Sequence, residues 1–270
     1  MQVLFLDGYN LIHRARYGFM KGDNATVFGF FRSLRPLIEK FNPDKAYFVL
    51  EGYPKHRYEM APDYKGTRDR TYDDSFQRQK KTIINLMEEY FPITTIRHPD
   101  YECDDVLGHL VRYTHANDNC IVVSSDTDFL QLYNTHANVK IYNPVRKKVL
   151  DHPGYDYVTW KSLRGDGADN IKGIKGIGDK RAQALMKEPE KLQELLAKGE
   201  NRLIFERNQA LIGFADLREE LGGFEVSTPM VQWESLKGKF EDFGFDSITN
   251  DKSWVKFYQT FLRLEQSAGV

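Results

Sequence analysis

Short apolar runs and longer helical repeats alternate along the first half of the chain. The runs have the length and the β-branched or aromatic content of buried strands, and they lie at residues 3–7, 46–50, 93–97 and 120–125. Between them, apolar residues recur every three or four positions, which predicts helices at residues 26–41, at residues 74–90 and from Glu102 onward. This alternation predicts an α/β fold, with a mostly parallel sheet flanked by helices on both faces.

The remaining segments are less regular. The pattern over residues 139–150 predicts a hairpin that turns at Asn143–Pro144. A short helix is predicted over Asp128–Tyr133. Residues 52–72 have no periodicity and are rich in Tyr, Lys, Arg, Pro and Gly, so we expect a mobile or weakly helical excursion. From about residue 155 the pattern becomes helical, notably in 189–221 and 253–265, whereas 222–250 shows no readable pattern. We therefore expect two regions, 1–155 and 156–270, with the excursion inside about 52–90.

Composition fits a globular protein with a proper core. The chain has 270 residues, of which 41% are hydrophobic and 13% aromatic, and no apolar run reaches the ~18 residues of a membrane span. The first apolar run meets Asp7 and is too short for a secretory signal. Cys103 and Cys120 both fall in predicted regular structure, which indicates reduced cysteines in a cytoplasmic protein rather than a disulfide framework.

Charge alone does not decide whether the partner is a nucleic acid. The formal net charge is −1, whereas phosphate binders are usually basic overall. The charges are unevenly distributed along the chain, because basic residues gather in residues 55–81 and again in residues 172–181. The charge balance is therefore neutral evidence.

Acidic residues follow the predicted strands or begin the next helix. They are Asp7, Glu51, Glu102, Asp104, Asp105, Asp126 and Asp128, and a later pair, Asp166 and Asp169, belongs to the stretch LRGDGADN. A charge next to an apolar run is costly unless something neutralises it, and sites in parallel sheets form beyond the carboxyl ends of the strands. Ligation by oxygen alone indicates Mg²⁺ or Mn²⁺ rather than zinc.

Each acidic stretch by itself has a simpler explanation. Acids in the first turn of a helix are favoured by the helix dipole, which fits Glu102 to Asp105 and also Asp126 and Asp128, and Asp7 alone could simply end a strand. Capping becomes a weaker explanation when several separate strand ends are acidic. The chemistry that such a set would support is phosphodiester hydrolysis by two metal ions held roughly 3.5–4 Å apart, with Asp7, Asp126 and Asp128 among the catalytic residues.

A basic pair precedes most of the acids. In DYKGTRDR, Lys65 and Arg68 are three residues apart and follow Tyr64. If the segment is helical over the site, both cations face a scissile phosphate, where Lys supplies a point charge and Arg grips two oxygens. Tyr64 is then placed to stack on a terminal base. The alternative is an ordinary solvated polar loop.

The stretch GIKGIGDKRA has the pattern of a helix-hairpin-helix. Gly176 and Gly178 would let backbone amides approach phosphates, and the helix that follows carries Lys180 and Arg181 in its first turn. Contacts of this kind read no base sequence. The alternative is an ordinary glycine-rich turn between two helices.

With these motifs, the chain resembles the 5′ nuclease (flap endonuclease) superfamily, particularly bacteriophage 5′–3′ exonucleases and the N-terminal nuclease domain of bacterial DNA polymerase I. The resemblance runs from Asp7 to about Met186. It rests on motifs in family order and at family spacing, namely LFLDGYN, DYKGTRD, YECDDVL, SSDTDFLQL and GDGADNIKGIKGIGDKRA. The resemblance implies a PIN-like nuclease domain in residues 1–155, with a helical arch or gateway at about 52–90, and a duplex-binding hairpin in the second region.

The resemblance also implies the ligands and the substrate. It assigns the acids named above to Mg²⁺ or Mn²⁺, and Lys65 and Arg68 to the arch that handles the 5′ strand. Family members often hold K⁺ at the hairpin through main-chain carbonyls, and the matching residues are Leu163, Arg164, Lys172, Ile174 and Ile177. The implied substrate is double-stranded DNA with a 5′ end, flap or nick, processed in replication or repair by a monomer without membrane attachment.

Two positions depart from the family pattern. Glu51 stands where the family usually has Asp after the second strand, so its longer side chain is expected to reach a metal through an adjusted geometry, either directly or through a water. Gly167 stands where some relatives have an acid, although Asp166 and Asp169 remain.

Three other functions are open to this sequence. One is an RNase H-like enzyme of the same chemistry that removes RNA primers from RNA/DNA hybrids. Another is a DNA-binding module that keeps the hairpin without catalysis, against which the intact acid set argues. A third is a single-strand RNase of the PIN type, which would not need the hairpin.

Overall fold

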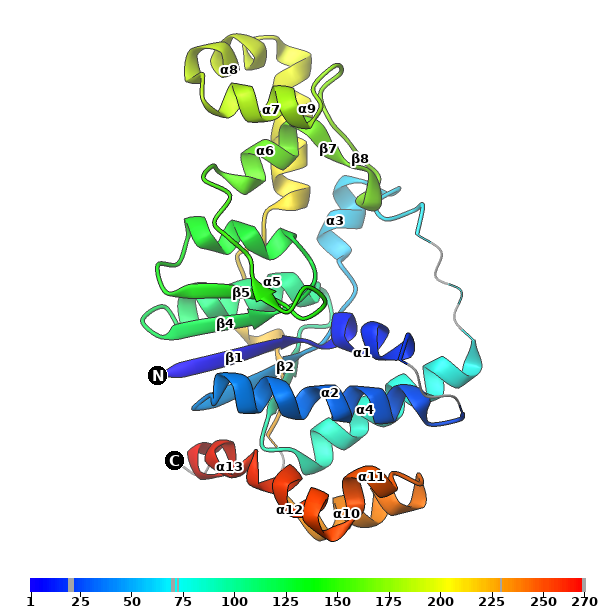
Figure 1. The fold of residues 1–270 in the computed structure, drawn as a ribbon. Coiled ribbons are helices and arrows are strands. Elements are labelled where there is room, and N and C mark those ends of the chain that lie inside the picture. The colour runs from blue at the N-terminus through cyan, green and yellow to red at the C-terminus, as the bar shows by residue number, and fades with distance from the viewer. Residues whose placement is uncertain (19–21, 69–70, 72, 229, 269–270) are drawn as a thin grey trace.

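The core of the protein is one mixed sheet (Figure 1). The computed structural model describes residues 1–18, 22–68, 71, 73–228 and 230–268. Within these residues the sheet has seven strands in the order β6-β5-β4-β1-β2-β3-β9. The five central strands are parallel, and the two edge strands β6 and β9 pair antiparallel. The strands are β1 (Gln2–Asp7), β2 (Lys45–Val49), β3 (Thr94–Arg97), β4 (Asn119–Val123), β5 (Val139–Asn143), β6 (Lys148–Val149) and β9 (Glu225–Ser227).

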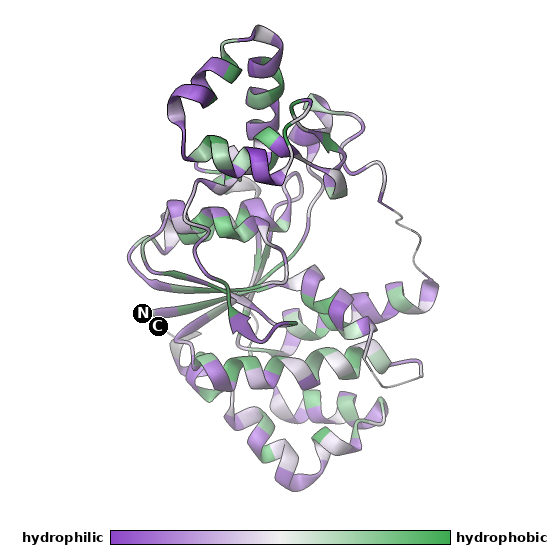
Figure 2. Ribbon diagram, turned by 45° about the horizontal axis from the view of Figure 1, so that its top comes forward, coloured by the Kyte–Doolittle hydropathy of each residue, from purple (hydrophilic) through white to green (hydrophobic). Residues whose placement is uncertain are grey.

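Strand β1 shows why the sheet is covered on both faces. Successive side chains of a strand point to opposite faces, and in β1 Leu4 and Leu6 belong to one buried cluster while Val3 and Phe5 belong to another. All four are fully buried. Parallel strands that are buried on both faces read as continuous apolar runs, and Figure 2 shows these hydrophobic strands inside a shell of helices with polar outer faces.

The first face is covered by helices from both ends of the chain. They are α1 (Gly8–Arg16), α2 (Ala25–Phe41), α4 (Asp74–Tyr90), α10 (Trp233–Asp242), α11 (Asp246–Thr249), α12 (Asp251–Gln259) and α13 (Leu262–Ala268). Phe31 of α2 stacks on Phe91 with ring centroids 5.0 Å apart, and it contacts Phe240 of α10 at 5.1 Å. Aromatic packing therefore attaches the C-terminal helices to the N-terminal half.

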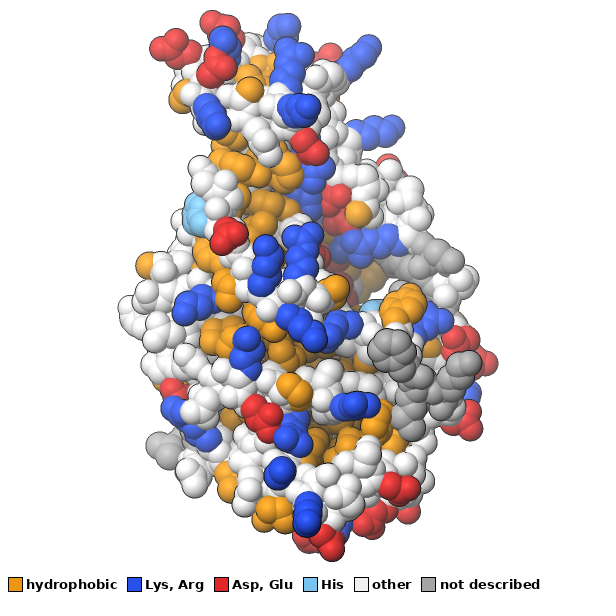
Figure 3. Space-filling view, in the orientation of Figure 1, with side chains coloured by type: hydrophobic (Ala, Val, Ile, Leu, Met, Phe, Trp, Pro, Cys, Tyr) orange, Lys and Arg blue, Asp and Glu red, His pale blue; other side chains and the backbone are white. Residues whose placement is uncertain are grey.

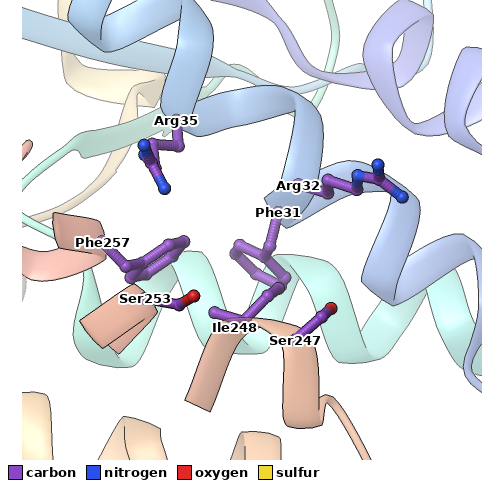
Figure 4. Close-up of a pocket in the computed structure, with 7 residues that line it drawn as sticks. All are labelled: Phe31, Arg32, Arg35, Ser247, Ile248, Ser253 and Phe257. Atoms are coloured by element: carbon purple, nitrogen blue, oxygen red, sulfur yellow. The ribbon is translucent and has the colours of Figure 1, made fainter. Parts of the chain in front are cut away.

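A cavity of about 260 Å³ lies where α2 meets α11 and α12 (Figure 4). Phe31, Ile248 and Phe257 form its apolar floor, and its polar lining comes from Arg32, Arg35, Ser247 and Ser253. Phe31, Ile248 and Phe257 belong to the buried cluster of the first face, so the cavity lies on that side of the sheet.

The second face is covered by fewer elements. Helix α5 (Cys103–His109) continues as a wider turn over Leu110–Thr114, and a 3-10 helix (Asp128–Asn134) packs beside it. Above them stand α6 (Tyr157–Arg164), α7 (Asp179–Met186), α8 (Pro189–Leu196) and α9 (Gly199–Ile212), which share a separate buried cluster around Trp160 and Leu163. These four helices, called here the α6–α9 lobe, form the top of the molecule in Figure 1.

The structure confirms the predicted α/β fold. Each predicted strand and the helices at 26–41 and 74–90 are present within a residue or two, and α5 begins one residue after its predicted start with Glu102 as its N-cap. The hairpin formed by β5 and β6 is also present. The 52–72 excursion contains α3 (Lys55–Met60) and then turns, while residues 69, 70 and 72 lie outside the described part.

Two expectations about the second half differ from the structure. Residues 213–220 are not helical, although a helix was predicted over 189–221. The grouping of 156–270 as one region also differs, because β9 joins the edge of the main sheet and α10 to α13 pack on its first face. The reason is aromatic burial between residues that are about 200 positions apart, which no local pattern reports. Among the described helices, none is long and apolar enough to cross a membrane.

Candidate metal centre and nucleic-acid interface

A cleft of about 790 Å³ lies at the carboxyl ends of β1, β2 and β4. Eight of the nine predicted acids line it, namely Asp7, Glu51, Glu102, Asp104, Asp126, Asp128, Asp166 and Asp169. The convergence follows from topology, because adjacent parallel strands deliver their ends to the same edge. Acids that are up to 162 positions apart in the sequence (7 to 169) thus share one cavity.

Asp7 joins the end of β1 to the start of α1. Its carboxylate accepts a hydrogen bond from the Asn10 backbone N–H at 3.2 Å, as a helix N-cap does. The Ser124 hydroxyl, at the end of β4, donates to its other oxygen at 2.6 Å. Burial raises the pKa of Asp7, and these hydrogen bonds only partly oppose that shift. Its negative charge is therefore costly unless a cation is near.

A first cluster of carboxylates sits at the start of α5. Oxygens of Glu102, Asp104 and Asp105 lie within 4.8 Å of one another, which is compatible with a shared metal ion. Glu102 and Asp105 form a reciprocal capping box, so the sequence-based capping explanation holds for these two residues. Asp104 faces the cleft instead, and one of its buried oxygens has no hydrogen-bond partner in the described structure. Burial, followed by the charge of Asp105, raises the pKa of Asp104 well above its ordinary value.

Arg57 of α3 neutralises two acids of this cluster. Its guanidinium donates to Asp105 at 2.5 and 2.7 Å and to Glu102 at 2.7 Å, and its side chain is 1% exposed. The Arg57 Nε–H also donates to the Leu211 carbonyl at 2.9 Å. Arg57 therefore connects the 52–72 excursion to the start of α5 and to the end of α9.

Asp105 is the one predicted acid that does not line the cleft. Besides Arg57, its carboxylate accepts hydrogen bonds from the Ala215 N–H at 2.8 Å and the Glu102 N–H at 3.2 Å. It is completely buried. These contacts use most of its acceptor capacity, so a direct role in metal binding stays a prediction, while its role in holding Arg57 is visible.

A second cluster of carboxylates lies in the same cleft. Oxygens of Asp128, Asp166 and Asp169 also fall within 4.8 Å of one another. Lys161 of α6, whose side chain is 6% exposed, contacts Asp128 and reaches Asp166 at 2.6 Å. Burial works against the charged form of Asp166, but the hydrogen bond and charge of Lys161 hold its pKa below the ordinary value. For Asp128, burial and the charge of Asp126 raise the pKa.

Asp126 and Glu51 line the same cleft. Asp126 is solvent-exposed, and its carboxylate accepts the Asp128 N–H at 2.9 Å. Glu51 accepts the Cys103 N–H at 3.0 Å. Burial, with the nearby charge of Glu102, raises the pKa of Glu51 to about 7. The longer Glu side chain thus reaches the cleft, and whether it ligates a metal stays a prediction.

The predicted basic pair lies over the acids. Lys65 forms an ion pair with Glu102, and Arg68 forms one with Asp169. Lys65 has a left-handed backbone (φ 53°) and its N–H donates to the Asp169 carbonyl at 3.0 Å. The excursion is thereby attached to the second cluster as well as to the first.

The placement of Tyr64 differs from the expectation that it stacks on a base. Its side chain is 3% exposed, and its hydroxyl donates to Glu102 at 2.9 Å and lies 3.3 Å from Asp169. The ring belongs to a small buried cluster with Ile171, Leu211 and Ile212. Since the ring faces are covered, Tyr64 bridges acids in this structure instead of offering a surface to DNA.

The glycine hairpin connects β8 (Ile171–Lys172) to α7. Gly176 has φ 79°, a conformation that L side chains rarely adopt, and Ile177 N–H donates to the Ile174 carbonyl at 3.0 Å across the turn. Ile174 and Ile177 are buried, while Gly176, Gly178, Lys180 and Arg181 are exposed. The buried isoleucines hold the turn, and its glycines and cations are exposed, which is compatible with a phosphate-binding hairpin.

Among the residues predicted to hold K⁺, two main-chain carbonyls already accept hydrogen bonds. The carbonyl of Leu163 accepts from Ile174 N–H at 2.9 Å, and that of Lys172 accepts from the Asn208 side chain at 2.9 Å. A carbonyl oxygen has a second lone pair, so these bonds leave room for an ion. The five residues remain a prediction from the family resemblance.

The cleft has the donor set of a hard divalent cation. Eight carboxylates line it, against five Lys and Arg side chains among the described residues, and all candidate metal ligands are carboxylates. Oxygen-only sites with excess negative charge suit Mg²⁺ and Mn²⁺. Figure 3 shows basic side chains gathered on the face in view, from the middle of the molecule to the α6–α9 lobe, with acids in a hollow among them.

Sequence reasoning missed Arg57 and Lys161. Both are buried cations with a distant acidic partner, because Arg57 contacts Glu102 over 45 positions and Lys161 contacts Asp128 over 33. Arg57 was noted only as part of a basic stretch, and Lys161 was not noted. A weak signal existed, because Lys161 lies one helical turn after Tyr157 and directly after Trp160, both of which are buried aromatic residues of α6.

The chain is similar to bacterial DNA polymerases I and to a bacterial 5′-3′ exonuclease. DNA polymerase I of Treponema pallidum (strain Nichols) is 32% identical over 205 residues, which cover 67% of this chain and 20% of that protein. The 5′-3′ exonuclease of Mycoplasmopsis pulmonis (strain UAB CTIP) is 26% identical over 204 residues, covering 71% of this chain and 68% of the relative. This chain thus spans only 20–23% of three of the DNA polymerase I relatives it matches.

Solved structures show the same fold. The bacteriophage T5 D15 flap endonuclease, in a pseudo-enzyme-product complex with DNA and metal ions, has a TM-score of 0.67 and 19% identity over 100% of both chains. The T5 5′-exonuclease with bound zinc has a TM-score of 0.66 and 19% identity, covering 99% of this chain and 100% of the other. Residues 2–159 match the family model described as 5′-3′ exonuclease, N-terminal resolvase-like domain, and the chain belongs to that family.

Proposed function

We propose that this protein is a divalent-metal-dependent, structure-selective 5′ nuclease that hydrolyses phosphodiesters in DNA with 5′ ends, flaps or nicks, in replication or repair. The observation that carries the proposal is the pairing of two carboxylate clusters within one cleft. Membership of the 5′-3′ exonuclease family supports it.

The residues fit a two-metal arrangement. One ion would be held by Asp7, Glu102, Asp104 and Asp126, and the other by Asp128, Asp166 and Asp169. Such ions lower the pKa of a bound water and offset charge on the phosphate. Oδ1 of Asp104 supports a cation at that point, because this buried oxygen accepts no hydrogen bond and lies 3.9 Å from Arg57 Nη1, and a buried carboxylate oxygen without a hydrogen bond is costly.

Lys65 and Arg68 would hold the scissile phosphate. They come from the excursion and extend over the acids of both clusters. A point charge and a two-pronged guanidinium together fix a phosphate's position and stabilise negative charge that develops on it. Lys161 stays below, where it balances Asp128 and Asp166.

The hairpin would bind the duplex beside the cleft. Gly176, Gly178, Lys180 and Arg181 offer exposed amides and cations without any base-specific group. K⁺ at Leu163, Arg164, Lys172, Ile174 and Ile177 would stiffen the turn. Selectivity would thus come from the shape of the DNA, because the duplex would bind to the hairpin while the 5′ strand enters the cleft.

A Mg²⁺ titration on one 5′-labelled flap substrate, with product lengths resolved on a gel, tests the proposal. Cleavage should require Mg²⁺ or Mn²⁺ and should release the flap or short 5′ products. An RNA/DNA hybrid is assayed in parallel, and faster cleavage of the hybrid would favour primer removal as the main activity. Binding without cleavage of any 5′-ended substrate in either metal would refute the nuclease assignment.

A further inference from the structure

We propose that Tyr53, backed by Tyr58, is a stacking surface for one unpaired nucleobase of the 5′ strand at the rim of the acidic cleft. The proposal deepens the nuclease function and rests on it. Tyr53 lines the same cleft as Glu51, Lys65 and Glu102, yet 57% of its side chain is exposed. No catalytic role described above uses it.

The ring of Tyr53 is supported from one side. It stacks on the ring of Tyr58 with centroids 5.0 Å apart and an interplanar angle of 15°. Tyr58 in turn meets the buried ring of Tyr64 edge-on at 5.8 Å. With one face on Tyr58 and more than half of the side chain exposed, Tyr53 has its other face open to solvent.

The backbone at Tyr53 is held in place. Its N–H donates to the Pro99 carbonyl at 2.7 Å, and the Gly52 N–H donates to the Tyr101 carbonyl at 3.0 Å. A Cβ at Gly52 would lie 2.0 Å from the His98 carbonyl oxygen, so only glycine permits this approach. A fixed aromatic surface loses little conformational entropy on binding.

The chemistry of the cleft points to a nucleobase. The acids of the cleft suit metal ions and its cations suit a phosphate, whereas an exposed aromatic face suits neither. A base attached to the bound phosphate provides a flat π surface that stacks on aromatic rings regardless of sequence. In a duplex both faces of a base are already stacked, so Tyr53 would take a base that is unpaired, as in a flap or a frayed 5′ end.

Abasic scanning combined with Tyr53→Ala tests this directly. Flap substrates carry a single abasic nucleotide at each position next to the scissile bond, and kcat/KM is measured for the wild type and the variant. At one position, removing the base should slow the wild type about 5- to 150-fold, the range that base–aromatic stacking implies. The same removal should leave Tyr53→Ala unchanged, because its stacking partner is already absent.

Two variants serve as controls. Tyr53→Phe keeps the ring and should match the wild type. Tyr113→Ala removes a 40%-exposed tyrosine that does not line the cleft, and it should keep the wild-type response to every abasic site. Equal thermal midpoints for all variants establish that the fold is intact.

The two proposals fail in different ways. The stacking surface alone is overturned if the wild type cleaves and every abasic site lowers kcat/KM of Tyr53→Ala as much as it lowers kcat/KM of the wild type. A wild type that cleaves no substrate overturns the nuclease function on which this inference depends.

Discussion

Arg57 shows how a single side chain can organise an acidic cleft without lining it. It is 1% exposed and holds Glu102 and Asp105 in fixed positions at the start of α5. A buried ion pair adds little net stability when it is compared with apolar packing, but removing one partner leaves an uncompensated charge. The geometry of the first cluster therefore depends on a residue from the excursion.

Replacing Arg57 by Met should lower the free energy of unfolding by about 3–5 kcal/mol, because Glu102 and Asp105 would be left unpaired. Urea unfolding followed by circular dichroism measures this. Arg202→Met, which removes an exposed pair with Glu206, should change stability by less than about 0.5 kcal/mol. Equal effects of the two changes would contradict the role of Arg57.

The carboxylates of Asp126 and Asp128 should matter for chemistry more than for DNA binding. Asp126→Ala or Asp128→Ala should abolish cleavage in Mg²⁺ while duplex DNA affinity stays within about threefold, since the hairpin is untouched. Gel-resolved cleavage and fluorescence anisotropy measure the two effects. Asp246→Ala, on α11, is the matched control and should cleave normally. An active double variant at 126 and 128 would exclude both residues from catalysis.

Lys65 should contribute to the chemical step. Lys65→Ala should slow single-turnover cleavage by about 10²-fold or more, the usual effect of losing one preorganised donor to developing charge, with a smaller loss of affinity. Lys81→Ala, an exposed lysine on α4, provides the comparison. If the single-turnover rate of Lys65→Ala equals that of the wild type, the residue does not touch the reacting phosphate.

At the scale of elements, the hairpin between β8 and α7 is a self-contained unit. Its apolar residues Ile174 and Ile177 fill the cluster under the α6–α9 lobe, and its glycines and cations face outward. In the proposed function this unit contacts the backbone of DNA, so its contribution should appear as a dependence of binding on salt.

The double change Lys180→Ala with Arg181→Ala should weaken duplex binding and reduce the slope of log K against log salt concentration by about 2, because each lost phosphate contact removes about 0.9. Anisotropy titrations at several salt concentrations measure the slope. Lys252→Ala with Lys256→Ala, on α12 at the other end of the molecule, should leave it unchanged. An unaltered slope for the hairpin variant would place the duplex elsewhere.

At the scale of the whole molecule, the C-terminal helices are part of the catalytic core. Phe240 is fully buried against Phe31, Phe245 and Phe257, and β9 completes one edge of the sheet. The sheet that presents the acids therefore depends on residues near the end of the chain.

Phe240→Ala should lower the free energy of unfolding by about 3–5 kcal/mol through lost burial and a residual cavity. The loss should appear in one cooperative transition that includes the cleft, monitored by circular dichroism and by retained nuclease activity. Val255→Ala, at a 41%-exposed position on α12, should have little effect. A separate early transition of the C-terminal helices, with activity preserved, would show that they are an independent unit.

Local patterns were sufficient for the sheet and for most of the site. Strands that are buried on both faces read as apolar runs, and the acids that follow them meet because parallel strands end at one edge. The glycine spacing of the hairpin is equally local, since Gly176 alone in that turn requires a positive φ. The described structure gives Asp7, Asp104 and Asp126 one shared cleft, as the sequence predicts.

Only the tertiary structure decided which cations the acids meet. The contacts of Arg57 with Glu102 and Asp105 span 45 and 48 positions, and that of Lys161 with Asp128 spans 33. The burial of Tyr64 and the return of the C-terminal helices to α2 are likewise long-range. Sequence periodicity reports which face of an element is buried, but the free energy of pairing two distant elements depends on side-chain packing that exists only in the folded chain.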